Sequence, residues 1–380
     1  MSLPEGTMLP SEHERKQIFS WLKRISSYSA WNRIHGYYQT WANVAERSVR
    51  IAVDKGWVLK YGPDGNVNGG YPAPDRPTGY TGSAISESDL IRIWKGLAHF
   101  EEGLRRLRQG DKRVFKYDAN GEFVMGKNEY SAWGTTIYRI DIGESGIDEQ
   151  HTPLWTEFKA ARLSLGEASG ECAPEIIESQ WLGDPAPTFY GKYLQDLLPK
   201  MTFPAPLPEV PDPHDNVLIP TGKDIPCSGI WEPIDAPPVK QSFSLFGNEE
   251  KTKGPFAPAG CMNYLHAGSA APKAKRKIGA ESDYAEVTWR LLWRDDRYED
   301  GSIPAEEADY VFLKPQAPEP AAADPMPASS DVLYGETGQP VPKAGRWLVE
   351  DDLDASVTLG IGDTLPEHNG RHVRWVLAEH

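Results

Sequence analysis

The residues with the clearest potential for covalent chemistry lie together in the segment Cys261-Met262-Asn263-Tyr264-Leu265-His266. A Cys–His pair is catalytic only where the imidazole meets the thiol in space and a third group orients the ring. The spacing establishes neither condition. Gly260 and Gly268 flank the segment and favour tight turns of a small β unit. We therefore interpret Cys261 as a structural thiol.

Other catalytic patterns are less specific still. The nine histidines are scattered, and Gly370, between His368 and His372, argues against a helix that presents both to a metal. The chain has no P-loop, GxSxG elbow or HExxH helix. Carboxylate pairs in so acidic a chain do not indicate glycoside chemistry. The sequence thus predicts no catalytic residue, no cofactor, no metal site and no enzyme.

Length, net charge and cysteine content indicate which partners and which compartment suit this chain. The chain has 380 residues, which favours two domains, and a net charge of −15. That charge argues against nucleic-acid and anionic membrane surfaces and suits either simple solubility or a basic protein partner. The three cysteines lack CxxC spacing, which fits a reducing compartment. With no signal peptide and no membrane-spanning run, we expect a cytoplasmic protein.

The N-terminal half predicts helices rich in tryptophan. Ser11 and Glu14 form a capping-box pattern at the start of the first one. Apolar residues at helical spacing predict two longer helices, over about 31–55 and 86–110, and the aromatic residues on them are typical of a core. Thr152-Pro153 opens a further helix through Leu165, and shorter helical patterns follow around 176–182 and 190–198.

Two segments in this half resemble hairpins. Val58–Val67 contains Asp-Gly and Val114–Phe123 contains Asn-Gly, each between apolar residues. Such pairs tolerate the positive φ of tight hairpin turns. Either the helix–hairpin element is duplicated, or common turn chemistry has produced the likeness by chance.

The C-terminal half predicts strands. A Pro-rich connector over 203–225 separates a mainly helical domain, 1–202, from a β-rich module, 226–315. A Pro/Ala linker over 316–330 then leads to a small β module, 331–380. Alternation around Trp289 and Trp293 indicates a strand, and further strands are expected at 310–313, 346–350, 356–360 and 372–377. The fold class is α+β: a Trp-rich helical domain with hairpin insertions, then small antiparallel modules.

Two tryptophan-centred units stand out in the β-rich half. Gly229 and Trp231 belong to the first, and Gly345 and Trp347 to the second. A Trp ring can anchor a very small β core. The residues expected to build these units are Gly229, Trp231, Gly260, Cys261, Asn263, Tyr264, His266, Gly345 and Trp347. We interpret them as scaffold.

These residues also carry a family resemblance. The segments Cys227–Pro233 and Gly260–Pro272, with the Trp-rich opening from Phe19 to Asn43, resemble the immunity protein 71 and immunity protein 72 families of bacterial polymorphic-toxin systems. The unit around Trp347 resembles a small β module that recurs beside type VI secretion effectors. The resemblance implies a non-enzymatic inhibitor of a cognate toxin.

For such an inhibitor we expect nanomolar or tighter binding, on the order of 10⁻⁹ M, and electrostatic steering of a basic toxin. Two acidic stretches are the candidate contacts, with ordinary solvent exposure as the alternative reading. They comprise Asp295, Asp296, Tyr298, Glu299 and Asp300, and Glu350, Asp351 and Asp352. Two other functions stay open: a chaperone or adaptor that loads a type VI effector, and a hydrolase that reverses a toxin's modification.

Overall fold

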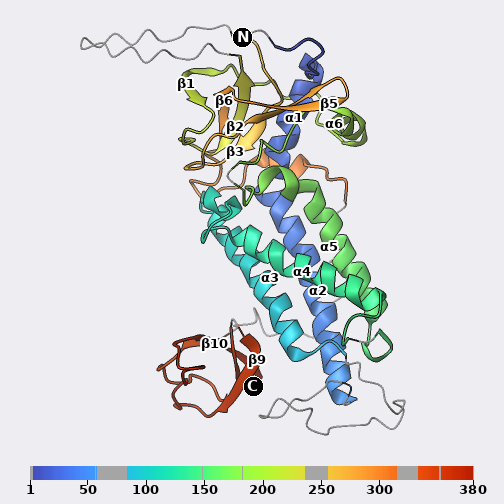
Figure 1. Cartoon of the computed structure of the whole chain (residues 1–380), viewed down its shortest axis with the longest axis vertical. Coiled ribbons are helices and arrows are strands. Elements are labelled where there is room, and N and C mark those ends of the chain that lie inside the picture. Colours follow the sequence, from blue (N-terminus) through green and yellow to red (C-terminus); the bar gives the residue numbers. More distant parts are fainter. Residues whose placement is uncertain are drawn as a thin grey trace, which may run out of the picture. The chain divides into compact units, whose positions relative to one another are not determined.

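The computed structural model describes residues 3–55, 57, 84–147, 149–181, 183–235, 256–314, 333–350 and 352–379. The chain divides into two compact units. The first comprises Met1–Tyr37, Ala98–Asn128 and Leu163–Ala317, and the second comprises Tyr38–Leu97, Glu129–Arg162 and Pro318–His380. Figure 1 shows helices, then antiparallel strands, along the chain. The predicted α+β class is confirmed.

Helices lie close to the predicted ranges at 12–25, 28–54, 87–107 and 192–197. The helix that begins near Pro153 runs on to Ile176, and the short helix predicted around 176–182 is wrong because the described residues there form no separate helix. The helix over 122–141 was not predicted. At the start of the first helix, Ser11 Oγ accepts the N–H of Glu14 (3.3 Å) and the Glu14 carboxylate accepts the N–H of Ser11 (2.9 Å), which confirms the capping box. The α-helices of the described chain are α1 (Glu12–Ile25), α2 (Tyr28–Asp54), α3 (Glu87–Leu107), α4 (Glu122–Asp141), α5 (Trp155–Ile176) and α6 (Lys192–Leu197).

The tryptophans of the helices are core residues, as predicted. In the first unit, Trp31 stacks on Phe123 with ring centroids 4.4 Å apart and also contacts Phe100 and Phe115. Gly103 faces this cluster, and a Cβ there would lie 2.7 Å from the Phe123 ring. Close packing therefore requires glycine at this position. In the second unit, a separate cluster joins Trp41, Trp133 and Phe158.

The hairpin predicted at Val114–Phe123 is wrong. Lys112–Phe115 forms a 3₁₀ turn, and α4 begins at Glu122. Asp118 accepts the N–H of Asn120 (2.7 Å) through its side chain. This Asx turn introduces a helix as readily as a strand, and helical packing decides between them because Phe115 and Phe123 are both buried. The other predicted hairpin, Val58–Val67, lies outside the described residues.

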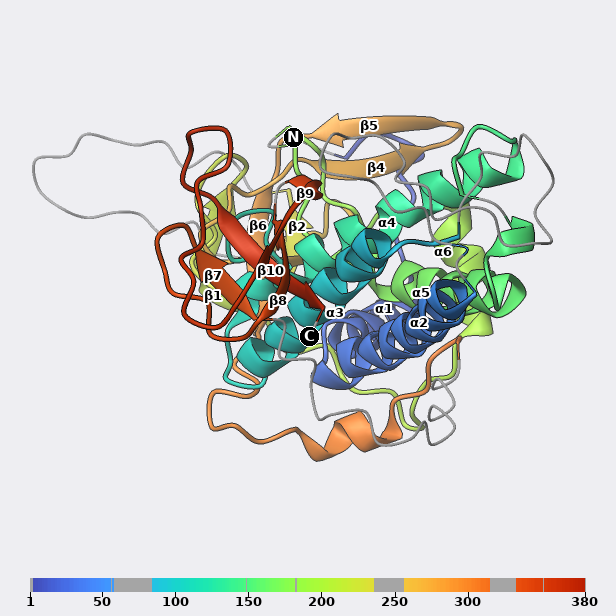
Figure 2. The same cartoon turned by 90° about the horizontal axis from the view of Figure 1, so that it is seen from below.

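Two four-stranded antiparallel sheets have the same topology. The first has the order β1-β6-β2-β3 and the second the order β7-β10-β8-β9, with β10 between β7 and β8 (Figure 2). Their strands are β1 (His214–Pro220), β2 (Gly229–Ile234), β3 (Asn263–Leu265), β6 (Thr288–Arg294), β7 (Tyr334–Glu336), β8 (Gly345–Val349), β9 (Asp352–Leu359) and β10 (Arg374–Glu379). A separate hairpin joins β4 (Ala274–Ile278) to β5 (Glu281–Ala285). Residues 310–313, predicted as a strand, form none.

The two sheets also share their internal hydrogen bonds. In the first, the carbonyl of Pro272 accepts from the Trp289 indole at 2.8 Å. In the second, the carbonyl of Pro366 accepts from the Trp375 indole at 3.0 Å. Further matched residues, named for the first sheet and then the second, are Thr221 and Thr337, Ile225 and Val341, Gly229 and Gly345, and Trp231 and Trp347. The sheets are therefore two copies of one module.

A glycine before each module tryptophan explains part of the sequence likeness. Gly229 has φ of +157° and Gly345 has φ of +156°. A Cβ at Gly229 would lie 2.2 Å from the main-chain oxygen of Trp293 on the neighbouring strand. Glycine is required there because the strands approach too closely for any side chain.

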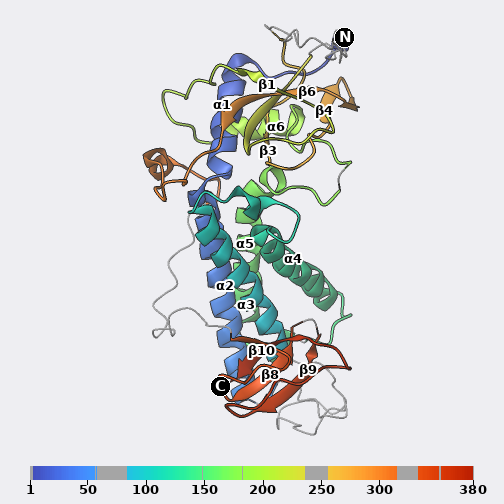
Figure 3. The ribbon, with the colours of Figure 1, turned by 90° about the vertical axis from the view of Figure 1, so that its left-hand side faces the viewer.

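The modules hold a helix on the same sheet face by different chemistry. In the first, the buried carboxylate of Glu232 on β2 lies 2.6 Å from a guanidinium nitrogen of Arg15 on α1, and α1 runs beside β2 (Figure 3). In the second, Leu348 occupies the matching position and clusters with Ile91 of α3. One scaffold thus binds a helix through an ion pair in one copy and an apolar contact in the other.

Candidate functional site

The first acidic stretch forms a loop directly after β6. Asp295, at its start, is buried and accepts hydrogen bonds from Arg297 Nη2 (2.7 Å) and the Tyr264 hydroxyl (2.8 Å). Lys112 Nζ lies 3.7 Å away. Burial works to raise the pKa of Asp295, but the charge and hydrogen bonds of Arg297 outweigh it and hold the pKa below its usual value.

Arg297 connects this loop to the end of α1. Its guanidinium donates to the carbonyl of Lys23 (2.9 Å) and to the Ser26 hydroxyl (2.8 Å), and it lies 4.9 Å from the Trp293 ring. A cation at this place complements the unpaired carbonyls and negative end of the helix. Arg297 therefore fixes the loop and stabilises α1 together.

Tyr298 and Glu307 hold the start of α2 in the same way. The Tyr298 hydroxyl accepts the N–H of Tyr28 (2.7 Å) and donates to the Glu307 carboxylate, which also accepts the N–H of Ser29 (2.9 Å). Tyr298 has φ of +73°, an uncommon conformation for a tyrosine. We call the set Asp295, Arg297, Tyr298 and Glu307 the loop clamp.

The loop clamp leaves three of the predicted acids at the surface. Asp296, Glu299 and Asp300 are exposed, whereas Asp295 and Tyr298 are buried in the clamp. Asp300 accepts from the N–H of Ser302 (2.9 Å), which keeps the loop turned. We call Asp296, Glu299 and Asp300 the acidic loop.

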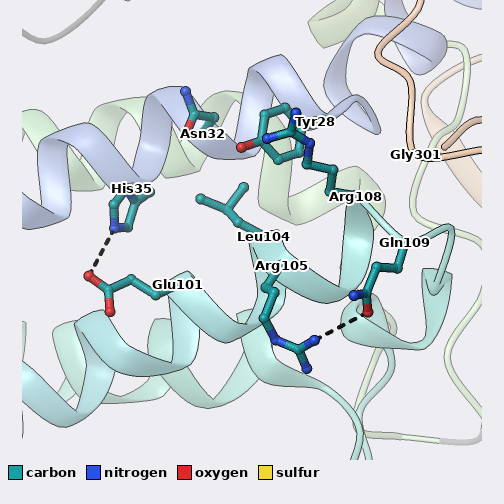
Figure 4. Close-up of a pocket in the computed structure, with 9 residues that line it drawn as sticks. All are labelled: Tyr28, Asn32, His35, Glu101, Leu104, Arg105, Arg108, Gln109 and Gly301. Carbon is teal, nitrogen blue, oxygen red and sulfur yellow. Dashed lines mark hydrogen bonds and ion pairs between the residues drawn. The ribbon is translucent and has the colours of Figure 1, made fainter. Parts of the chain in front are cut away.

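Beside the acidic loop, Gly301 borders a hollow between α2 and α3 (Figure 4). His35 Nε2 lies 3.6 Å from the Glu101 carboxylate across it, and Arg105 donates to Gln109 at 3.2 Å. The hollow thus presents groups of both charges next to a purely acidic surface.

The second acidic stretch belongs to the other compact unit. Glu350 is half-buried, 3.8 Å from Lys95 and 3.7 Å from Arg374. Asp352 is exposed at the first position of β9, with His368 at 3.2 Å. Asp351 lies outside the described residues.

The residues predicted to build the two modules are buried, apart from the half-buried Gly345. Trp231 and Trp347 are buried core residues, and Asn263 and Tyr264 are buried on β3. Gly260 packs so closely that a Cβ there would lie 3.1 Å from the Pro233 ring. Cys261 is a buried free thiol whose pKa is raised by burial. Within the described chain, no hydrogen bond joins it to His266.

Sequence reasoning missed the residues that fix the acidic loop. Arg297 stands inside a charged run that reads as a solvated face, and Glu307 lies in a stretch with no distinctive pattern. Their partners on α1 and α2 are more than 250 positions away in sequence, as the separation of 274 between Arg297 and Lys23 shows. The local sign of the clamp is the positive φ of Tyr298, which is seen in the structure and not in the sequence.

His266 gives a prediction for pH dependence. It is buried, and burial lowers its pKa from 6.5 to about 4. The unfolded chain therefore takes up a proton near pH 6.5, while the folded protein stays neutral at this site until about pH 4. The free energy of unfolding therefore includes the full contribution of neutral His266 above pH 6.5. It falls by up to about 3 kcal/mol as the pH decreases from 6.5 to about 4.

Urea denaturation of the wild type and His266→Asn at pH 7 and pH 4.5 would measure this loss. We expect the wild type to lose more free energy of unfolding over this interval than the variant. Equal losses in both proteins would show that His266 does not cause the acid sensitivity.

The described residues include neither a membrane-spanning helix nor a metal-binding cluster. No helix there combines the length and apolar character needed to cross a membrane. The same residues contain no cluster of three or more His, Cys, Asp or Glu side chains arranged to hold a metal ion.

Comparison with known families defines the class of this protein as an immunity protein. Residues 9–65 and 73–187 match the family model Immunity protein 71, and residues 210–311 match Immunity protein 72. The chain belongs to these immunity protein families, as its sequence predicted. Searches of curated proteins and of solved structures found no match. The Immunity protein 72 match contains the first β module and the whole acidic loop.

Proposed function

We propose that this protein binds a cognate antibacterial toxin in the cytoplasm and neutralises it by occlusion, without catalysing a reaction. The toxin would be basic and delivered by a type VI secretion system. Membership of the immunity protein families supports the toxin as partner. The observation that most favours a basic toxin is the acidic loop, Asp296, Glu299 and Asp300, held by a buried clamp.

Loop clamping matters because binding costs conformational entropy. A loop already fixed by Arg297 and Tyr298 has less freedom to lose when a partner docks. Its three carboxylates would then present negative potential in one arrangement, in a chain with a net charge of −15. Such a potential accelerates the encounter with a positively charged cleft.

Co-expression tests the proposed function. The C-terminal domain of the toxin encoded by the neighbouring gene would be produced with and without this protein in a sensitive strain. We expect growth to be restored and a complex of fixed stoichiometry to co-purify. Protection by trace amounts of the protein against excess toxin would contradict occlusion and indicate an enzyme. Binding outside the toxin domain without rescue would indicate a chaperone or adaptor.

Steering by the acidic loop predicts an effect on association rate. The triple variant Asp296→Asn, Glu299→Gln, Asp300→Asn should slow association about 10-fold at low salt and change dissociation little, because rim charges act mainly on encounter. The wild-type rate should fall with added salt, and the variant's rate should fall less steeply. Stopped-flow mixing with the toxin domain from 20 to about 500 mM NaCl would measure both.

The matched control removes three exposed carboxylates elsewhere in the same unit: Asp212→Asn, Glu281→Gln and Glu286→Gln. It changes the net charge equally, so a similar slowing in the control would assign steering to total charge and not to the acidic loop.

A further inference from the structure

The outer edges of the two modules differ although their folds agree. In the first module, the edge strand β3 spans only Asn263–Leu265. In the second, the corresponding strand β9 spans Asp352–Leu359. Backbone groups on an edge strand are a template for pairing with another extended chain.

In the first module, side chains of β3 bind other segments of the chain. The Asn263 side chain accepts the N–H of Thr188 (2.7 Å) and donates to the carbonyl of Thr188 (2.8 Å). One amide side chain thus reproduces the donor and acceptor pair of a neighbouring strand. The adjacent Tyr264 is covered by the edge-to-face ring of Phe115, with centroids 6.3 Å apart. Side chains of β3 thus bind two other segments of the chain, around Thr188 and around Phe115.

In the second module, β9 pairs with β8, and with no other strand of the described chain. The hydrogen bonds of the neighbouring strands show which residues of β9 point their backbone N–H and C=O groups away from β8. Leu377 on β10 donates its N–H to Leu333, on the β7 side. Backbone groups alternate along a strand, so Val376 faces β8 and its partner Leu348 faces β10.

The same alternation carries across β8 to β9. Trp347, next to Leu348, faces β9 and is paired with Val357. Val357 therefore faces β8, while Ser356 and Thr358 direct their N–H and C=O groups away from the sheet. Both of these residues are exposed.

The side chains of β9 suit a hydrophilic, basic strand. Ala355, Val357 and Leu359 pack on the module core, which leaves exposed Ser356 and Thr358 on the other face. The strand contains no Lys and no Pro, the residues that usually protect an edge from pairing. Its first residue, Asp352, is exposed, so a carboxylate marks one end of the edge.

We propose that β9 is a docking strand, and that an extended segment of the toxin with Lys or Arg opposite Asp352 pairs with its outer edge as a fifth strand. This rests on the proposed function, because the toxin is the partner. The main-chain bonds at Ser356 and Thr358 would give affinity, and the Asp352 carboxylate at one end would set the direction of the added strand.

A proline on the outer edge tests the proposal. Thr358→Pro removes an outward N–H and leaves the bonds of Val357 to β8 in place, since proline is tolerated on edge strands. We expect it to weaken binding of the neighbouring gene's toxin domain at least about 10-fold, the loss of one or two main-chain hydrogen bonds. Thr358→Val keeps the backbone N–H and should bind like the wild type. Calorimetric titration would measure all three proteins.

Hydrogen exchange gives a second readout that needs no variant. Binding of the toxin domain should slow exchange of the Ser356 and Thr358 amides by about 10-fold or more, and this decides the matter if Thr358→Pro does not fold. The docking strand would be overturned if folded Thr358→Pro bound the toxin domain with the affinity of the wild type. It would also be overturned if the wild type bound without protection of the β9 amides. Either result would leave the proposed function standing. Failure of the wild type to bind the toxin domain would instead count against the proposed function. A free-state dimer abolished by Thr358→Pro would overturn the proposal in favour of a second copy on this edge.

Discussion

Replacing Arg297 with Met is expected to lower the free energy of unfolding by about 3–5 kcal/mol, because it leaves a buried carboxylate without its main partner. Asp295 would keep the Tyr264 hydroxyl, the main-chain N–H of position 297 at 3.3 Å and Lys112, 3.7 Å away. The carbonyl of Lys23 and the Ser26 hydroxyl would lose their donor as well. Urea denaturation followed by tryptophan fluorescence would measure the loss.

Two further variants separate charge burial from general disruption. Arg294→Met removes an exposed guanidinium 4.0 Å from Glu299, which is more than half exposed, and should cost less than about 1 kcal/mol. The double variant Asp295→Leu, Arg297→Met removes both buried charges and should recover part of the stability lost in Arg297→Met. A single Arg297→Met variant as stable as Arg294→Met would contradict the assigned role of the clamp.

The same variant connects stability to recognition. Without Arg297, the acidic loop loses its attachment to α1, so its carboxylates would sample more conformations. We therefore expect Arg297→Met to weaken toxin binding even at temperatures where it stays folded. The exposed acids are the proposed contacts, and the buried residues between them hold the arrangement.

Local patterns were sufficient to predict several elements, but not the helix α4 and not the long-range polar contacts. Ser11 and Glu14 cap α1 through neighbours three positions apart, and the alternation around Trp289 marks β6 within a few residues. Arg297 and Glu307 act on α1 and α2 across most of the chain, so no window of sequence contains both partners. A run of acids around a single arginine has the same composition whether it is solvated or half-buried.

Turn chemistry was ambiguous for a similar reason. Asp118, Asn120 and Gly121 satisfy the backbone of a tight turn whichever element comes next. The helix that follows is selected by Phe115 and Phe123, which pack against Trp31 of α2. The paired tryptophan units were recognisable because glycine, tryptophan and proline each have a fixed structural role in both copies. The contact of Asn263 on β3 depends on Thr188, which lies outside the module, and is invisible in either unit's own sequence.

Substituting alanine for one module tryptophan should destabilise that module by about 3–5 kcal/mol, the usual cost of emptying a buried aromatic site. Trp347 is fully buried, its indole donates to the Lys343 carbonyl at 3.3 Å, and it shares a small core with Val341, Leu365 and Trp375. So few apolar partners cannot refill the space. Trp347→Ala should therefore open β7–β10, and with them the docking edge of β9.

Trp231→Ala is the matched variant, because Trp231 holds the same place in the first module and donates to the Cys227 carbonyl at 3.3 Å. Its loss should speed hydrogen exchange in β1, β2, β3 and β6 and loosen the acidic loop that follows β6. Trp347→Ala should speed exchange in β7–β10, because the two tryptophans belong to separate cores in separate units. Exchange that rises equally in both sheets for either variant would show that the modules unfold as one, and that the toxin contacts proposed on each depend on both.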